Sequence, residues 1–171
     1  SSSDEANRTQ FADDPRCMRF LVRLLRHADP EVQMHAAVAI ANIAFNNEGA
    51  QTFLGNNSAV ENLLALCTSN ITDVLEAATS ALVNIACFND ANCKRVVELG
   101  GVPVLLDLVH TEAAESPLDE KQAAEIHANV VETMANVCRY CPTDVGVHFT
   151  DQILGDIVLL CASENIQIQR H

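Results

Sequence analysis

Three segments of this chain share one spacing of residues. In two of them a Leu is followed eight residues later by Val, and ten residues after the Val by Asn; the third keeps this order with about ten extra residues before an Ile. The three sets are Leu24, Val32 and Asn42; Leu66, Val74 and Asn84; and Leu108, Ile126 and Asn136. The period is therefore about 42 residues, which the insertion lengthens to about 52, and such a period predicts a helical solenoid whose stacked units bury one continuous apolar core.

The same template continues to the end of the chain. Leu160 and Ile168 begin a fourth set, and residues 168–171 repeat residues 32–35 almost letter for letter. The chain thus stops early in a predicted helix, and it does not begin with Met. We therefore expect a fragment of a longer array.

The phase of the repeat divides the chain. Residues 1–13 are polar and are predicted to be disordered. Units are predicted at about 14–46, 47–88 and 89–141, followed by a partial unit at 142–171. The expected helices cover 16–26, 30–45, 47–54, 58–67, 72–87, 90–99 and 102–110, with a long one that ends near 140. No segment has the alternation of a strand.

Short signals mark several of the expected helix ends. Residues 29–31, Asp-Pro-Glu, combine a capping side chain, a Pro at the first helical position and an acid in the first turn. Thr72 or Ser69 is expected to cap the helix that follows them. Gly55 is expected to end a short helix, and the Gly-Gly pair at 100–101 to break the chain between two helices.

Composition favours closely packed helices over a β-sandwich. Hydrophobic residues make up 49% of the chain, aromatic residues only 4%, and Trp is absent. No apolar run approaches the roughly 18 residues that a membrane span needs. The chain has seven Cys, an odd number, and they are scattered along the sequence. This argues against a disulfide framework and indicates a reducing compartment. We therefore expect the cytoplasm, with the nucleus as a second compartment.

The charge is strongly acidic and uneven. The net charge is −13, with +1 over residues 14–46, −4 over 47–88, −5 over 89–141 and −3 over 142–171. Such a surface repels nucleic acid and anionic membranes. A charged partner is therefore expected to be basic.

Several motifs recur in the same phase and together resemble the armadillo repeat. They are Glu-Leu-Gly-Gly-Val-Pro-Val-Leu-Leu-Asp-Leu at 98–108, Asp-Pro-Glu-Val-Gln at 29–33, and Ala-rich segments that end Asn-Ile-Ala at 42–44 and 84–86. The resemblance covers nearly everything after residue 14. It implies an all-α, right-handed armadillo-repeat α-solenoid of three-helix units. HEAT repeats are the nearest alternative, but they are two-helix units and typically lack the Gly-Gly break and the Asn.

The resemblance also implies a binding groove. In proteins similar to importin-α and β-catenin, the Asn of each third helix lines a concave groove and hydrogen-bonds the main chain of an extended peptide. The matching positions here are Asn42, Asn84 and Asn136. A carboxamide both donates and accepts, so it suits a peptide unit whatever the side chain. The alternative role is a hydrogen bond to neighbouring backbone that fixes the packing of the unit.

Other residues share the face of the Asn by helical spacing. One turn earlier lie Val38, Ser80 and Glu132, and two turns earlier lie Met34 and Glu76. Glu76 and Glu132 either attract a basic ligand or are solvated helix charges. The Trp that recurs at one of these positions in importin-α is missing. Phe45 and Phe88, which follow the Asn, either line the edge of the groove or plug the core, and the core is the expected role.

The sequence lacks an ordered catalytic set. The pairs Cys138 with Cys141 and Cys87 with Cys93 have no second pair at metal-site spacing, so we expect no metal and no cofactor. The insertion at 111–121 is either a contact loop or phosphorylation site, or a tolerated surface insertion. We therefore expect no enzyme but a noncatalytic scaffold or adaptor that binds an extended, basic segment of a partner protein. The alternatives are a nuclear-import receptor for basic peptides and an assembly module that packs on a folded partner; partner identity and oligomeric state are left open.

Overall fold

The computed structural model describes residues 14–111 and 120–141, and every regular element in these ranges is an α-helix. The helices, in order, are α2 (Pro15–Leu24), α3 (Pro30–Ala44), α4 (Glu48–Asn56), α5 (Ala59–Leu66), α6 (Thr72–Ala86), α7 (Asp90–Glu98), α8 (Gly101–Thr111) and α9 (Glu120–Tyr140). The all-α prediction is confirmed. The predicted segment 1–13, the centre of the insertion and the partial unit at 142–171 lie outside the described residues.

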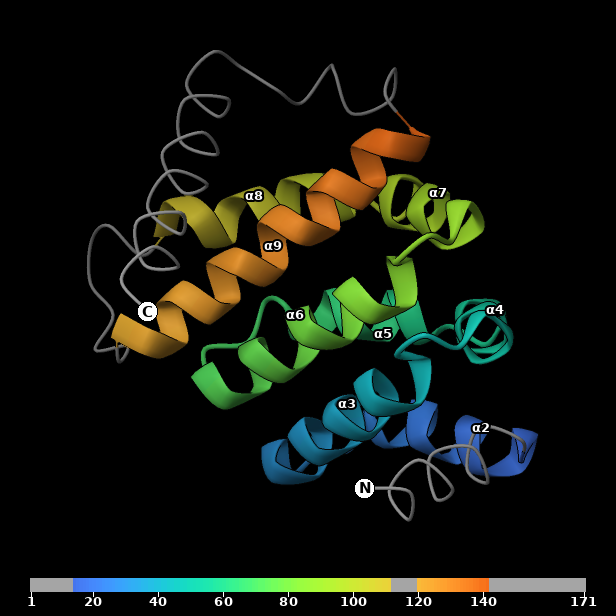
Figure 1. The fold of residues 1–171 in the computed structure, drawn as a ribbon. Coiled ribbons are helices and arrows are strands. Elements are labelled where there is room, and N and C mark those ends of the chain that lie inside the picture. The colour runs from blue at the N-terminus through green and yellow to red at the C-terminus, as the bar shows by residue number, and fades with distance from the viewer. Residues whose placement is uncertain (1–13, 112–119, 142–171) are drawn as a thin grey trace, which may run out of the picture.

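The helices are arranged in repeating layers. Helices α3, α6 and α9 lie side by side, with α6 in the middle (Figure 1). Helices α2, α5 and α8 lie behind them, and α4 and α7 lie next to each other along one side of the stack (right in Figure 1). Successive layers therefore share one interior, as expected for an α-solenoid.

The middle helix α6 shows how this interior is built. Nine of its fifteen residues are buried, more than the single stripe of a surface helix, because α3 and α9 cover two of its flanks. Leu82 and Ile85 are fully buried, and the small Ala77, Ala78 and Ala81 let the neighbouring helices approach closely. The Ala-rich template is thus the consequence of packing on both sides.

Side-chain caps set the start of several helices. Asp29 Oδ1 accepts a hydrogen bond of 3.0 Å from the backbone N of Glu31, with Pro30 at the first helical position, as predicted. Asn47 and Asn89, which occupy equivalent positions of successive units, cap α4 and α7 in the same way. Each of these caps satisfies an N–H that has no partner within its own helix.

Two predicted helix ends are wrong. Neither Thr72 nor Ser69 caps α6: Ile71 occupies the cap position, and the Ser69 hydroxyl instead accepts from the backbone N of Ile71 over 3.1 Å. Gly55 does not end α4, which continues to Asn56. It is buried inside the helix, so its small size is required by packing and not by a turn.

The turns between helices repeat a backbone conformation and not a residue type. Ser58 and Gly100, one repeat period apart, have φ of 65° and 69°. Asn46 and Phe88, which are separated by the same period, have φ of 52° and 53°. The left-handed conformation is rare outside Gly and especially for a bulky residue such as Phe88. The stacking of the units therefore imposes the turn, and the local sequence adapts to it.

Candidate functional site

The exposed and half-buried residues of α3, α6 and α9 form what we call the third-helix face, and every predicted site residue except the buried Asn136 lies on it. Val38 and Glu132 are exposed and Ser80 is half-buried, at equivalent positions of the three helices. One turn earlier, Met34 and Glu76 are both half-buried. Because the three helices lie side by side, equivalent positions line up as rows across the face (Figure 1).

The row of three Asn is unequally accessible. Asn42 is exposed, Asn84 is half-buried, and Asn136 is only 7% exposed. Nδ2 of Asn84 donates to the carbonyl oxygen of Ala41 on α3 over 3.1 Å. Asn84 therefore links α6 to α3. The alternative role considered from the sequence, a hydrogen bond to neighbouring backbone, is present at this position.

One row of acidic residues on this face was not identified from the sequence. Glu31, Asp73 and Glu125 occupy equivalent positions on α3, α6 and α9, and all three are exposed. The repeat period that relates the Leu, Val and Asn sets would have found them, one turn or more before the positions that were considered. With Glu76 and Glu132 they make the face acidic.

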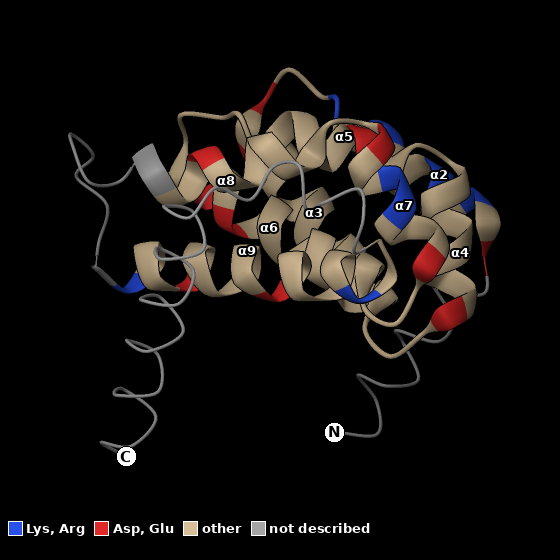
Figure 2. Cartoon of the chain, turned by 90° about the horizontal axis from the view of Figure 1, so that it is seen from above, with Lys and Arg blue, Asp and Glu red and all other residues tan. Residues whose placement is uncertain are grey.

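Few cations offset these acids. Lys121 and Arg139 lie near the two ends of α9, with Glu125 and Glu132 between them in the sequence. Along α9, Figure 2 shows acidic positions between basic ones. Lys121 is 3.7 Å from Glu125, and His35 is 3.9 Å from Glu31. Nε2 of Gln122 donates to Asp73 Oδ1 over 2.9 Å and to Glu76 Oε2 over 3.3 Å, so an amide from α9 bridges two carboxylates of α6.

The expected core role of two Phe is wrong. Phe45 is 53% exposed and Phe88 is 71% exposed. Phe45 directly follows the last residue of α3, and Phe88 lies in the turn two residues after the end of α6, with a φ of 53°. The guanidinium of Arg139 lies 5.4 Å from the centre of the Phe88 ring, within the range of a cation–π contact. The edge of the third-helix face is therefore aromatic.

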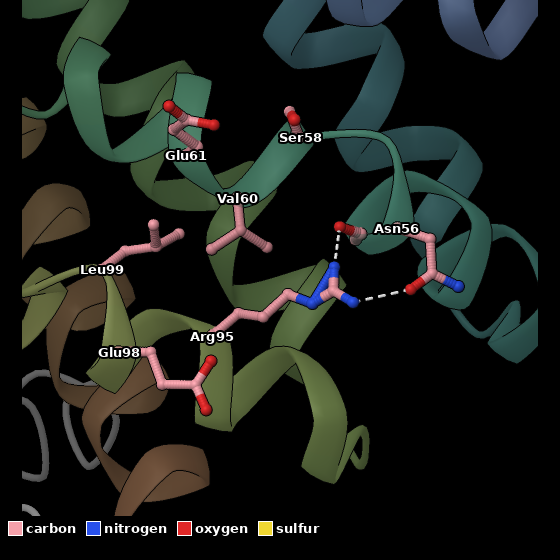
Figure 3. Close-up of a pocket in the computed structure, with 8 residues that line it drawn as sticks. Asn56, Ser58, Val60, Glu61, Arg95, Glu98 and Leu99 are labelled. Carbon is pink, nitrogen blue, oxygen red and sulfur yellow. Dashed lines mark hydrogen bonds between the residues drawn. The ribbon is translucent and has the colours of Figure 1, made fainter.

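A small pocket lies away from this face, between the end of α4, the start of α5 and the end of α7. Its volume is about 200 Å³, and Val60, Glu61, Arg95 and Glu98 are among its lining residues (Figure 3). Arg95 donates from Nη1 to the carbonyl of Gly55 and from Nη2 to Asn56 Oδ1, the latter over 2.7 Å. It thus satisfies one backbone carbonyl near the end of α4 and the side-chain oxygen of Asn56, which is a structural role.

None of Cys17, Cys67, Cys87, Cys93 and Cys138 forms a disulfide, and the pKa of each of these thiols is raised. Burial raises the pKa of Cys67 to about 12, and burial is also the main cause that raises the pKa of Cys93 to about 12. Desolvation raises the pKa of Cys138 as well. These thiols stay protonated near neutral pH, whereas metal binding and nucleophilic attack need a thiolate. Within 14–111 and 120–141, no cluster of three or more His, Cys, Asp or Glu is placed to hold a metal ion.

Thiol labelling tests this account. In the native chain at pH about 8, we expect Cys67 and Cys93 to resist iodoacetamide, because both are buried and protonated, while Cys17, which is half-buried, reacts first. Peptide mass spectrometry of timed samples gives the order. Equal labelling of all three residues in the native chain would contradict the packing described here, and equal labelling in denaturant is the control.

Comparison with known protein families identifies the family of this chain. A family model described as the plant U-box protein ARM repeat region matches residues 2–142, most of the chain. The chain belongs to the armadillo-repeat family. Its stacked helices and repeated rows are therefore those of an armadillo array, and the predicted right-handed α-solenoid is confirmed.

Several curated proteins are similar to this chain. A probable importin subunit alpha-A of Dictyostelium discoideum is 30% identical over 127 residues, which are 71% of this chain and 23% of the relative. Vacuolar protein 8 of Schizosaccharomyces pombe is 27% identical over 78% of this chain and 22% of its own length. The human armadillo repeat-containing protein 3 is 28% identical over 97% of this chain and 17% of its own length. The chain thus spans about a quarter or less of these relatives.

Solved structures share the fold. An engineered protein with 26% identity aligns over 94% of this chain and 63% of its own, with a TM-score of 0.61. A designed armadillo repeat protein in complex with the peptide (KR)4 has 22% identity and a TM-score of 0.56, over 90% of this chain and 70% of its own. The described helices include none that is both long and apolar enough to cross a membrane.

Proposed function

We propose that this armadillo array is a noncatalytic scaffold or adaptor that holds an extended segment of a partner protein across α3, α6 and α9. The single observation that carries the proposal is the alignment of equivalent exposed positions on three adjacent helices. An extended peptide has free main-chain groups at a regular spacing, so regularly spaced side chains can follow it. Asn42, which is exposed, and Asn84, which is half-buried, supply the carboxamides, and Val38 and Ser80 the contacts between them; the buried Asn136 has a packing role.

The charge of the face favours a basic segment. The row Glu31, Asp73 and Glu125 crosses all three helices, and Glu76 and Glu132 add two further carboxylates. Complementary charge raises the rate of encounter and discriminates against acidic competitors. Met34 and the exposed Phe45 offer apolar contacts to the stems of Lys and Arg side chains. We place this binding activity in the cytoplasm or the nucleus.

Replacing Asn84 by Ala tests the proposal. We expect the full chain to bind fluorescein-labelled (KR)4, and Asn84→Ala to weaken that binding by about 1 kcal/mol, or roughly fivefold, because a hydrogen bond to the peptide is lost. Fluorescence anisotropy at fixed low salt measures the affinity. Circular dichroism and thermal melting check that the helices remain.

Asn62→Ala is the matched control. Asn62 is also half-buried, and its Nδ2 donates to the carbonyl of Val22 over 3.3 Å, so it links successive layers on the other side of the array. We expect this variant to lose similar stability and to keep its affinity for (KR)4. Equal affinities for both variants would leave Asn84 with a structural role alone, and no binding of (KR)4 by the unmodified chain would contradict the basic ligand.

A nuclear-import receptor for basic peptides is a second candidate, favoured by the similarity to a probable importin subunit alpha-A. The absence of Trp argues against it, because no indole face is available to hold a Lys stem. A basic localisation peptide that binds at least tenfold more tightly than (KR)4 would favour this candidate. Comparable affinities would favour the general adaptor.

A further inference from the structure

Helix α2 carries a concentration of positive charge that the proposed groove does not use. Four of the ten Lys and Arg residues of the chain lie within eleven positions, and no acid occurs between residues 15 and 28. We call these four residues the arginine stripe: Arg16, Arg19, Arg23 and Arg26. All four are exposed. Arg16, Arg19 and Arg23 recur every three or four residues along α2, so they share one side of the helix, and Arg26 lies in the turn that continues it (Figure 2).

The fold does not require these arginines. The equivalent positions of α5 and α8 include Glu61 and Asp107, which have the opposite charge. Among the residues that the structure describes, Arg23 and Arg26 have no ion-pair partner, whereas Arg16 lies 3.7 Å from Asp14. Arg19 lies 5.6 Å from the centre of the Phe53 ring, so it has a packing role as well.

The stripe also has an apolar neighbour. Phe20 of α2 is 56% exposed beside it. Guanidinium groups next to an exposed aromatic ring are typical of protein interfaces, where Arg and aromatic residues are enriched. Four like charges spread over about 15 Å of helix also repel one another, and a bound anion relieves that repulsion.

We propose that the arginine stripe docks an Asp- or Glu-rich segment of a partner protein. Guanidinium groups pair with carboxylates through two parallel hydrogen bonds. Successive arginines rise by about 4.5–6 Å along the helix axis, close to the roughly 6.6 Å between alternate residues of an extended strand. A segment with an acid at every second residue therefore meets one guanidinium after another.

A local acidic segment fits better than an extended polyanion. The chain has a net charge of −13, so a membrane surface or a nucleic acid, which reaches beyond the stripe, also meets acidic surface that repels it. A short peptide contacts the stripe alone. Helix α2 lies in the layer behind α3, so this site differs from the third-helix face and does not depend on the function proposed for that face (Figure 1).

The test uses the full chain and a fluorescein-labelled (Glu-Ser)5 peptide as the probe. We expect anisotropy to show binding at low salt that weakens steeply as salt is added. The variant R23Q/R26Q removes the two arginines that have no ion-pair partner among the described residues. We expect it to lose between about twofold and about 25-fold in affinity, since each exposed pair contributes between about 1.4-fold and about fivefold. The variant R23K/R26K keeps the positive charge but cannot form the two parallel hydrogen bonds of a guanidinium group. We expect its loss of affinity to be smaller than that of R23Q/R26Q.

The control variant K94Q/R139Q removes the same charge from α7 and α9. We expect it to bind (Glu-Ser)5 as the unmodified chain does, and R23Q/R26Q to bind (KR)4 unchanged. No binding of (Glu-Ser)5, or equal losses in both double variants, would overturn the proposal. It would also be overturned by tighter binding to vesicles that contain phosphatidylserine than to the peptide, or by a dimer, seen in light scattering, that R23Q/R26Q abolishes.

Discussion

Gly55→Ala is expected to destabilise the chain by about 3–5 kcal/mol, although Ala is the better helix former. A Cβ at residue 55 of α4 would lie 1.8 Å from Oδ1 and 2.7 Å from Cγ of Asn92 on α7. Asn92 is only 2% exposed and cannot move aside freely. Its Nδ2 donates to the carbonyls of Gln51, over 2.9 Å, and Ile85, over 3.0 Å.

The expected loss is the sum of two effects. Overpacking of a well-packed interior costs about 1–3 kcal/mol, and each buried polar group left without its partner costs about 1–3 kcal/mol more. Moving Asn92 away from Gly55 would break both of its bonds to backbone carbonyls. Urea unfolding followed by circular dichroism measures the change in the free energy of unfolding.

Gly49→Ala is the control within the same helix. Its Cβ would lie 3.6 Å from Asn47 Oδ1, an ordinary contact, so we expect a neutral effect or a gain of up to about 1 kcal/mol. In an Asn92→Ala background, Gly55→Ala should cost much less than it does alone, because the clashing atoms are gone. A loss that is the same in both backgrounds would contradict the proposed clash.

The second large effect is expected at Gln51, where replacement by Met should cost about 2–4 kcal/mol. Nε2 of the buried Gln51 donates to the carbonyl of Ala44 on α3 over 3.1 Å and to that of Asn84 on α6 over 2.9 Å. Both carbonyls belong to the last turn of a helix, where the helix itself supplies no N–H; the carbonyl of Ala44 also accepts from the backbone N of Asn47, over 3.2 Å. Met fills nearly the same volume but cannot donate.

Gln33→Met is the control for this change. Gln33 donates from Nε2 to the carbonyl of His27 over 2.8 Å, but that bond is exposed and water can replace it. We expect less than about 0.5 kcal/mol for this variant. Equal losses at Gln33 and Gln51, measured by urea unfolding, would show that the buried carbonyls are not the cause.

Gln51 and Asn92 have the same role at successive junctions between units: each donates hydrogen bonds to backbone carbonyls near the end of a third helix. Cys93 lies one repeat period after Gln51, and its Sγ donates to the carbonyl of Ala86 over 3.3 Å, as Gln51 does to Ala44. A thiol is a weak donor. In this unit the neighbouring Asn92 supplies the stronger bond, to Ile85. The third helices α3 and α6 are therefore each closed by side chains of the helix that follows.

Much of the fold follows from residue spacing alone. The period of the Leu, Val and Asn sets predicted stacked helices, and the segment 29–31 predicted the start of α3 correctly. The errors at Gly55 and at the start of α6 have a common cause. Local rules assign a Gly to a turn and a hydroxyl to a cap, whereas here the Gly accommodates Asn92 and the hydroxyl of Ser69 bonds in front of the helix.

The candidate site shows the same division. Repeat spacing alone assigns Asn42, Asn84 and Asn136 to equivalent places and, applied one step further, the acidic row as well. Their exposure does not follow from spacing, because it depends on which neighbour covers each helix flank: Asn42 is open, Asn84 bonds to Ala41, and Asn136 is buried. Periodicity is a property of the sequence, so it was enough to predict the stacked helices and the rows of equivalent positions on α3, α6 and α9. Burial and hydrogen-bond partners are properties of contacts between units, and only the packed helices decided them.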